Sequence, residues 1–104
     1  MAEGMRLTLS GESGKQYTFY EFELGATFDE DYACVYLIRS ALGAVLYVGQ
    51  TNGINRRLEE HQSDYQGGCF RRNAARFVAV LLESSEARRL DIETDLRRQL
   101  NPRC

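Results

Sequence analysis

The sequence has no hydrophobic run that could cross a membrane. Its longest uninterrupted apolar stretches, residues 33–38 and 77–82, are far shorter than the roughly 18 residues that a membrane-spanning helix needs. The first residues also lack the charged-then-apolar pattern of a signal peptide and the arginine- and serine-rich pattern of a transit peptide. The length of 104 residues is typical of one compact domain. We therefore expect a cytoplasmic protein without a membrane segment.

Cysteine is scarce, and its positions match no common framework. Cys34, Cys69 and Cys104 are an odd number at long spacings, unlike the CxxC pairs of metal and redox sites or the even sets of disulfide scaffolds. His61 is the one histidine, so a zinc site would require all three cysteines to converge on it. We expect three reduced thiols and no zinc site.

Lysine is almost absent, because 12 of the 13 basic residues are arginine. The net charge of −2 also hides an uneven distribution along the chain. Residues 1–32 hold two basic and seven acidic residues, whereas residues 33–104 hold eleven basic and eight acidic residues. The planar guanidinium fork matches phosphate oxygens, so this usage favours a phosphate-facing surface, although a GC-rich codon bias would produce it as well.

Hydrophobic periodicity predicts an α+β fold. Alternating apolar and polar residues indicate strands, and apolar residues at three- or four-residue spacing indicate helices. In chain order we expect a hairpin of residues 5–9 and 16–24, a second hairpin of 33–39 and 44–48, a helix over 53–62 capped by Thr51 or Asn52, a loop with at most a short helical turn over 63–73, a buried strand over 76–82, and a final helix from Ser84 or Ser85 to Leu100. This order predicts a small central antiparallel β-sheet flanked by helices.

The first predicted helix places two polar residues beside its inner face. Ile54 and Leu58 set the direction of that face, and Arg57 and His61 flank it, one turn apart. Arg56 points to the opposite side. The arginine at position 57 is therefore the one that faces the rest of the domain.

The last predicted helix carries a carboxylate where an apolar residue is expected. Its apolar face is defined by four residues, Leu90, Ile92, Leu96 and Leu100. Glu93 lies within about 30° of the centre of that face. Burial of a charged carboxylate requires a partner. Glu93 therefore either forms an ion pair with a neighbour such as Arg89 or belongs to a site.

Five polar residues stand out from these patterns, namely Tyr36, Tyr47, Arg57, His61 and Glu93. Taken singly, the first four are most often packing or surface residues. As a set they lack the nucleophile and base of acyl transfer, but they suit phosphoryl transfer. Glu93 could hold a divalent cation, Arg57 could clamp a phosphate, and a tyrosine or His61 could orient or deprotonate a water.

The spacing of these residues resembles the GIY-YIG nuclease domain. The matching motifs are Cys34-Val35-Tyr36, Tyr47-Val48-Gly49-Gln50-Thr51, Arg57 eight residues after Gly49, His61 four residues later, and Glu93 followed by Asn101-Pro102. The similarity covers residues 33–104. Residues 1–32 remain as an acidic N-terminal β-hairpin extension, whose charge argues against DNA contact and which would extend or cover the sheet edge.

The resemblance implies a metal-dependent endonuclease that hydrolyses DNA phosphodiester bonds. Its fold would be a sheet of three core strands flanked by helices, with Gly49 as a structural motif residue. Glu93 would bind Mg²⁺ or Mn²⁺, and Arg57 would stabilise the charge that develops on the phosphate. Tyr36 and Tyr47 would line the site and position or activate water, and the resemblance leaves open which of them is the base.

Two departures from the family pattern bear on the activity. Cys34 replaces the glycine that usually opens the first motif. The asparagine that often follows the glutamate by twelve residues would fall at position 105, just past Cys104, so it is either outside this sequence or lost from this protein, and Asn101 is too early to be its equivalent. The alternative function is therefore a catalytically weak module with the same fold that binds nucleic acid or a partner. A chain of this size has little surface for sequence recognition, so a partner protein, a homodimer or structure-selective cutting would supply specificity.

Overall fold

The computed structural model describes the backbone of residues 4–65 and 68–104, and the side chains of these residues apart from 63–65. Its elements in chain order are β1 (Met5–Ser10), β2 (Gln16–Glu23), β3 (Cys34–Ser40), β4 (Val45–Thr51), α1 (Ile54–Tyr65), α2 (Cys69–Arg72), β5 (Ala75–Leu82) and α3 (Glu86–Leu100). Two residues of the predicted loop, 66 and 67, lie outside the described residues. The α+β fold is confirmed.

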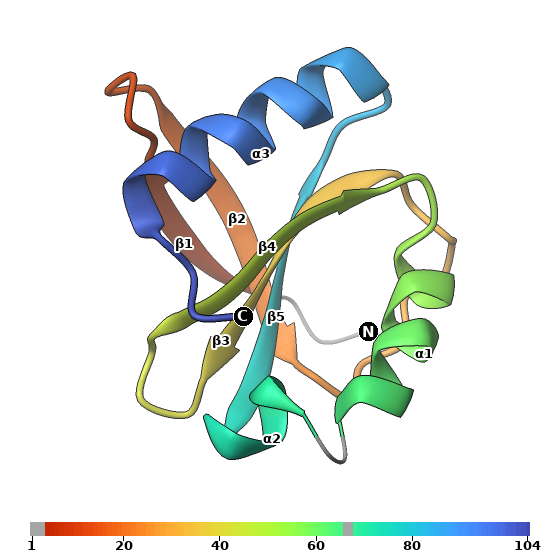
Figure 1. The fold of residues 1–104 in the computed structure, drawn as a ribbon. Coiled ribbons are helices and arrows are strands. Elements are labelled where there is room, and N and C mark those ends of the chain that lie inside the picture. The colour runs from red at the N-terminus through yellow and green to blue at the C-terminus, as the bar shows by residue number, and fades with distance from the viewer. Residues whose placement is uncertain (1–3, 66–67) are drawn as a thin grey trace.

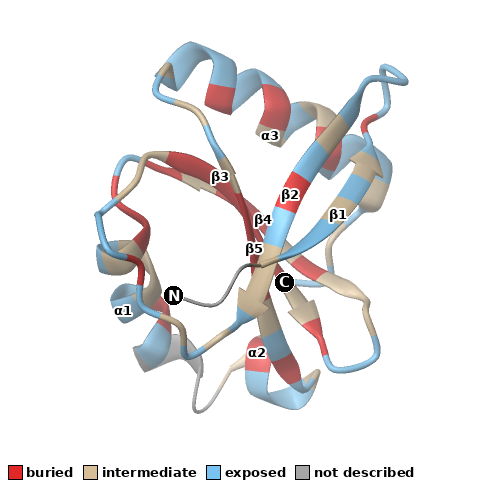
Figure 2. Cartoon of the chain, turned by 180° about the vertical axis from the view of Figure 1, so that it is seen from behind, coloured by how far each residue is buried: buried red, intermediate tan, exposed pale blue. Residues whose placement is uncertain are grey.

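The strands form one antiparallel sheet in the order β1-β2-β5-β3-β4 (Figure 1). The three strands expected from the family resemblance, β5, β3 and β4, lie together. The hairpin of β1 and β2 extends the sheet, because β2 pairs with the outer side of β5. β3 lies between β5 and β4 and is buried along almost its whole length, as the central strands of Figure 2 show.

The two faces of the sheet carry separate hydrophobic clusters. Alternate residues of β3 belong to different clusters, since successive side chains of a strand point to opposite faces. Tyr36 packs on the same face as Ile54 of α1 and Phe70 of α2. Val35 and Leu37 pack on the opposite face with Ile92 and Leu96 of α3. Helices therefore cover both faces.

Two local predictions need correction. β4 continues through Gly49 to Thr51, whereas the sequence predicted that the strand ends at residue 48 because glycine is typical of turns. The cap of α1 comes from the acidic connector that precedes β3: Asp31 Oδ1 accepts hydrogen bonds from the backbone N–H groups of Asn55 at 2.7 Å and Arg56 at 3.3 Å. A capping partner distant in sequence cannot be read from the residues adjacent to the helix.

The hairpin of β1 and β2 is fastened to α3 through one carboxylate. Asp95 accepts hydrogen bonds from the backbone N–H of Ser13 at 2.8 Å, from the hydroxyl of Ser13 at 2.6 Å and from the hydroxyl of Tyr17 at 2.8 Å. Gly11 lies against the same carboxylate, and a Cβ there would come within 2.1 Å of Asp95 Oδ2. The extension is thus packed onto the domain rather than appended to it.

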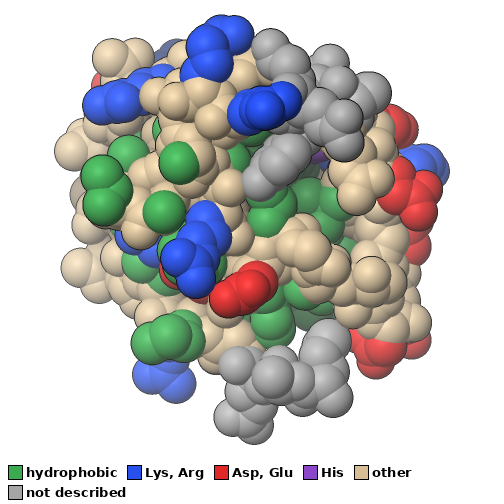
Figure 3. All heavy atoms as spheres, turned by 90° about the horizontal axis from the view of Figure 1, so that it is seen from below, with side chains coloured by type: hydrophobic (Ala, Val, Ile, Leu, Met, Phe, Trp, Pro, Cys, Tyr) green, Lys and Arg blue, Asp and Glu red, His purple; other side chains and the backbone are tan. Residues whose placement is uncertain are grey.

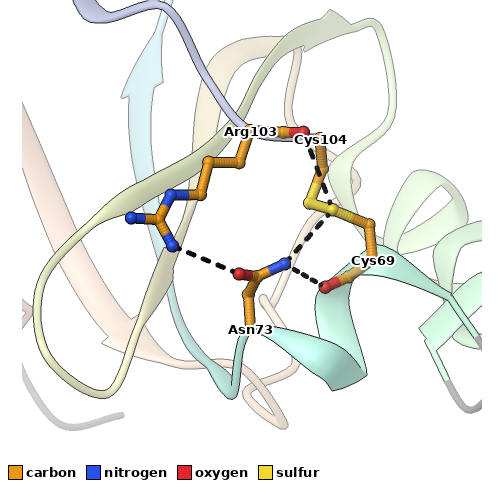
Figure 4. The surroundings of a disulfide bond; sticks show 4 residues. All are labelled: Cys69, Asn73, Arg103 and Cys104. Carbon is orange, nitrogen blue, oxygen red and sulfur yellow. Dashed lines mark hydrogen bonds between the residues drawn. A yellow bond between two sulfur atoms is a disulfide. The ribbon is translucent and has the colours of Figure 1, made fainter.

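The expectation of three reduced thiols is wrong. Cys69 and Cys104 form a disulfide across 35 residues (Figure 4). Cys34 is the free, buried cysteine. The pair forms because residues 101–104 turn back along β4, where the backbone N–H of Cys104 donates to the carbonyl of Leu46 at 2.7 Å. Cys69 and Cys104 are therefore close in space, with 5.9 Å between their Cα atoms, although they are far apart in the sequence. No helix in the described part of the chain has the length and hydrophobicity to cross a membrane.

Alkylation should distinguish the three cysteines. Burial raises the pKa of Cys34 to about 12, so its reactive thiolate is scarce at neutral pH. With iodoacetamide at about pH 8, we expect no label on the native protein, one label after unfolding without reductant, and three after unfolding with reductant. Intact mass spectrometry counts the labels. Two or more labels without reductant would contradict the disulfide.

Candidate active site

The hydroxyl of Tyr36 is the centre of a polar cluster between β3 and α1. The side chain is fully buried, and its hydroxyl oxygen lies 2.7 Å from Nε2 of His61. Arg57 donates a hydrogen bond from Nε to the same oxygen at 3.2 Å. The helical spacing of Arg57 and His61 therefore directs both side chains to one tyrosine, whereas Arg56 is exposed and bonds to Asn52.

Two of these side chains keep their protons at neutral pH. Burial raises the pKa of Tyr36 well above its ordinary value, so the phenol stays protonated. Its oxygen accepts a hydrogen bond from Nε of Arg57 and shares a second hydrogen bond with Nε2 of His61, whose direction depends on the tautomer of the imidazole. A hydrogen bond to Glu60 raises the pKa of Arg57, with Tyr36 and Tyr47 adding to it, so the guanidinium stays charged.

Tyr47 joins the cluster from β4. Its ring centroid lies 5.8 Å from that of Tyr36, 5.2 Å from that of His61 and 5.9 Å from that of Phe70. Phe70 is buried and also contacts His61, with a centroid distance of 5.4 Å. Tyr47 itself is half-buried, so its ring is held by aromatic neighbours while part of it remains accessible.

Gly49 allows the two tyrosines to approach each other. It lies directly opposite Tyr36 in the register of β3 and β4. A Cβ at this position would lie 2.7 Å from Cε2 of Tyr47 and 2.8 Å from both Cζ and the hydroxyl oxygen of Tyr36. Carbon atoms do not approach so closely, so a side chain here would displace one of the rings. The glycine of the second motif therefore has a steric role.

Glu93 lies on the other layer, along the outer edge of β4. It occupies the side of α3 that also carries Arg89 and Arg97, each four residues away. Arg89 donates from Nε to the side chain of Gln50 at 2.9 Å, and Arg97 donates to the carbonyl oxygen of Val48 at 2.7 and 2.9 Å. Both neighbours therefore direct their side chains to β4, and Glu93 lies between them.

The inner face of α3 differs from the prediction at Leu90, whereas Arg89 lies on the inner side as its helical position predicts. Its buried residues are Arg89, Ile92 and Leu96, whereas Leu90 is 43% exposed. The face is rotated because Arg89 is buried by bonds to Gln50 and to the carbonyls of residues 83 and 84. Glu93 is therefore half-buried at the border of the face, and the ion pair with Arg89 that the sequence left open does not form.

The carboxylate of Glu93 suits a hard divalent cation. Within the described residues it has no hydrogen bond or ion pair, and no group of three or more His, Cys, Asp or Glu side chains could complete a protein cage there. Mg²⁺ commonly takes one or two carboxylates and fills its remaining positions with water and substrate phosphate. A single free carboxylate is therefore compatible with the ion that the resemblance implies.

The structure thus brings four of the five predicted residues into one cluster, namely Tyr36, Tyr47, Arg57 and His61. Glu93 lies on α3, which packs on the opposite face of the sheet. Two residues that complete the surroundings of Tyr47 were not predicted from the sequence. Phe70 lies in a helix of four residues, which is too short for a periodic signal, and Arg97 places its Cζ 5.6 Å from the ring centroid of Tyr47.

Replacement of Gly49 by alanine should disrupt the cluster. We expect Gly49→Ala to lower the free energy of unfolding by about 1–3 kcal/mol, because the added methyl group overpacks the two tyrosine rings. The matched control is Gly25→Ala, because a Cβ at Gly25 meets no atom within 4 Å. Urea unfolding of both variants measures the difference. Equal free energies of unfolding for the two variants would show that the tyrosine rings accommodate the methyl group without loss of stability.

Comparison with known proteins agrees with this geometry. The model of the GIY-YIG catalytic domain matches residues 32–103, which include both tyrosine motifs, α1 and α3. No curated protein and no solved structure gives a match. The resemblance drawn from motif spacing is thereby confirmed, and the chain belongs to the GIY-YIG catalytic domain family.

Proposed function

We propose that this protein is a metal-dependent endonuclease that hydrolyses DNA phosphodiester bonds. Membership of the family implies nuclease-type activity in general. The observation that carries the specific proposal is the convergence of Arg57 and His61 on the hydroxyl of Tyr36, beside a half-buried Tyr47. A fixed cation next to ordered hydroxyl groups is the arrangement that phosphoryl transfer requires.

Arg57 is suited to stabilise the charge that develops on the phosphate. Its guanidinium is held on one side by Tyr36 and on the other by Glu60, to which Nη1 donates at 2.7 Å. About a third of the side chain remains accessible, with a relative exposure of 36%. A guanidinium that is already oriented needs no reorganisation as charge accumulates on the phosphate oxygens.

The two tyrosines take different roles in this proposal. Tyr36 is buried and protonated, and it acts as a fixed link between Arg57 and His61 rather than as an ionised base. Tyr47 is the tyrosine with an accessible part, so it is the one that positions or deprotonates the attacking water. His61 is 8% exposed and orients Tyr36 through the hydrogen bond between its Nε2 and the phenol oxygen.

Glu93 would hold Mg²⁺ or Mn²⁺. When bound, such an ion supplies Lewis-acid stabilisation of a phosphate oxygen and lowers the pKa of a coordinated water. The protein contributes the position of the carboxylate, which α3 fixes by packing Ile92 and Leu96 on the sheet. Arginine side chains elsewhere on the surface would attract the DNA backbone, and Figure 3 shows several Lys and Arg side chains on the underside of the molecule.

Loss of the Glu93 carboxylate should abolish cleavage. We expect the wild-type protein to convert supercoiled plasmid to nicked and linear forms with Mg²⁺ or Mn²⁺ but not with EDTA, and Glu93→Gln to leave the plasmid intact in either case. Asp91→Asn, an exposed carboxylate of the same helix, is the control that should cut normally. Binding without cleavage by the wild-type protein under all metal conditions would favour the catalytically weak binding module instead.

Arg57 and Arg56 provide a second matched pair. Arg57→Ala should raise the activation free energy of the chemical step by roughly 3 kcal/mol or more, which is comparable to the loss of one oxyanion donor. Arg57→Lys should recover only part of the rate, because an ammonium group lacks the planar fork. Arg56→Ala should have little effect, since this side chain is exposed and bonds to Asn52. Single-turnover cleavage at saturating enzyme isolates the step, and equal rates for the two alanine variants would refute the role of Arg57.

A further inference from the structure

Arg97 is held rigidly beside Tyr47 although it belongs to the opposite layer. Nε and Nη2 both donate to the carbonyl oxygen of Val48, at 2.9 and 2.7 Å, and the Cζ atom lies 5.6 Å from the centroid of the Tyr47 ring. Nη1 has no hydrogen-bond partner within the described residues. A ligand that binds Nη1 would therefore meet a cation whose side-chain conformation is already fixed, which lowers the entropic cost of binding.

A hollow of about 260 Å³ opens next to this guanidinium. Six residues line it, namely Tyr47, Val48, Arg97, Asn101, Pro102 and Cys104. None of the six side chains is acidic. Asn101 ends α3 in a left-handed conformation with φ of 48°, and its exposed side-chain amide has no partner in the part of the chain that the structure describes. The hollow therefore combines a fixed cation, a free amide and an aromatic wall.

The disulfide holds the outer wall of this hollow in place. It joins Cys104 to Cys69 of α2, which precedes the Phe70 that packs on Tyr47. Figure 4 shows a second link, in which Nη1 of Arg103 donates to Oδ1 of Asn73 at 3.3 Å. Residues 101–104 are thus tied both to β4 and to α2.

We infer that Arg97 and Asn101 form a second phosphate subsite, which binds a phosphate next to the scissile one on the strand that is cut. This inference rests on the proposed nuclease function. Glu93 and Arg97 are four residues apart, roughly 6 Å along the helix, on the side of α3 that faces β4, and Asn101 follows as the C-cap of the helix. A DNA strand whose scissile phosphate lies at Glu93 and Arg57 would carry its neighbouring phosphate to the guanidinium of Arg97.

Arg98 is the matched control for Arg97. It is adjacent in sequence and equal in charge, but its side chain is directed to Glu12, at 4.0 Å, on the side of the N-terminal hairpin. Fluorescence anisotropy with a labelled DNA duplex and Ca²⁺ in place of Mg²⁺ would measure the Kd over a series of salt concentrations. We expect Arg97→Ala to weaken binding about tenfold and to lower the salt dependence by about one counterion, and Arg98→Ala to change the Kd less than about twofold.

A second pair of variants guards against a purely structural effect of Arg97. Asn101→Gly removes the amide and keeps the left-handed backbone, and we expect it to weaken binding about threefold without a change in thermal stability. Cys69→Ser releases the wall of the hollow. In the Cys69→Ser variant, Arg97→Ala should raise the Kd by a much smaller factor than in the wild type, because both changes disrupt the same subsite. Full additivity, or no effect of Asn101→Gly, would overturn the inference.

The two proposals fail in different ways. If the wild type cuts DNA but Arg97→Ala and Arg98→Ala bind alike, the subsite is refuted and the nuclease function stands. If the wild type does not cut with Mg²⁺ or Mn²⁺, the nuclease function is refuted whatever the binding data show.

Discussion

The close packing of Tyr36 over Gly49 is the contact on which the rest of the site depends. Without a side chain at position 49, the phenol of β3 lies flat against β4 and its hydroxyl reaches α1. One buried oxygen then contacts two residues of that helix, because it accepts a hydrogen bond from Arg57 and shares another with His61. The ring also forms part of the wall against which Tyr47 packs. The absence of a side chain at Gly49 thus helps to determine where the guanidinium of Arg57 lies.

The edge strand β4 links the two layers of the molecule. An exposed edge presents unpaired backbone groups, which proteins usually cover. Here the outer carbonyls are covered by other parts of the same chain, that of Val48 by Arg97 and that of Leu46 by the backbone of Cys104. The groups that cover the edge also surround the accessible side of Tyr47. Protection of the strand and construction of the candidate site are therefore achieved by the same residues, and the disulfide secures them to α2.

The sequence predicted the features that arise from local pattern. Helical spacing correctly directed Arg57 rather than Arg56 toward the sheet, and motif spacing identified the family. Features that depend on distant segments were missed, because short-range periodicity contains no information about them. The disulfide joins a four-residue helix to residues 101–104, and the cap of α1 comes from Asp31, which precedes β3. The catalytic assignments of the tyrosines, Arg57, His61 and Glu93 stay predictions.

In the proposed mechanism, a phosphodiester and a divalent cation meet between Glu93 and Arg57. Crystals of the protein with DNA and Mn²⁺ would test this arrangement, because manganese is located directly by its anomalous scattering. We expect one peak at about 2.0–2.2 Å from a carboxylate oxygen of Glu93, with a phosphate oxygen bound both to the ion and to the guanidinium of Arg57. Mn²⁺ bound to other carboxylates, or DNA seated away from Tyr47 and Arg57, would contradict it.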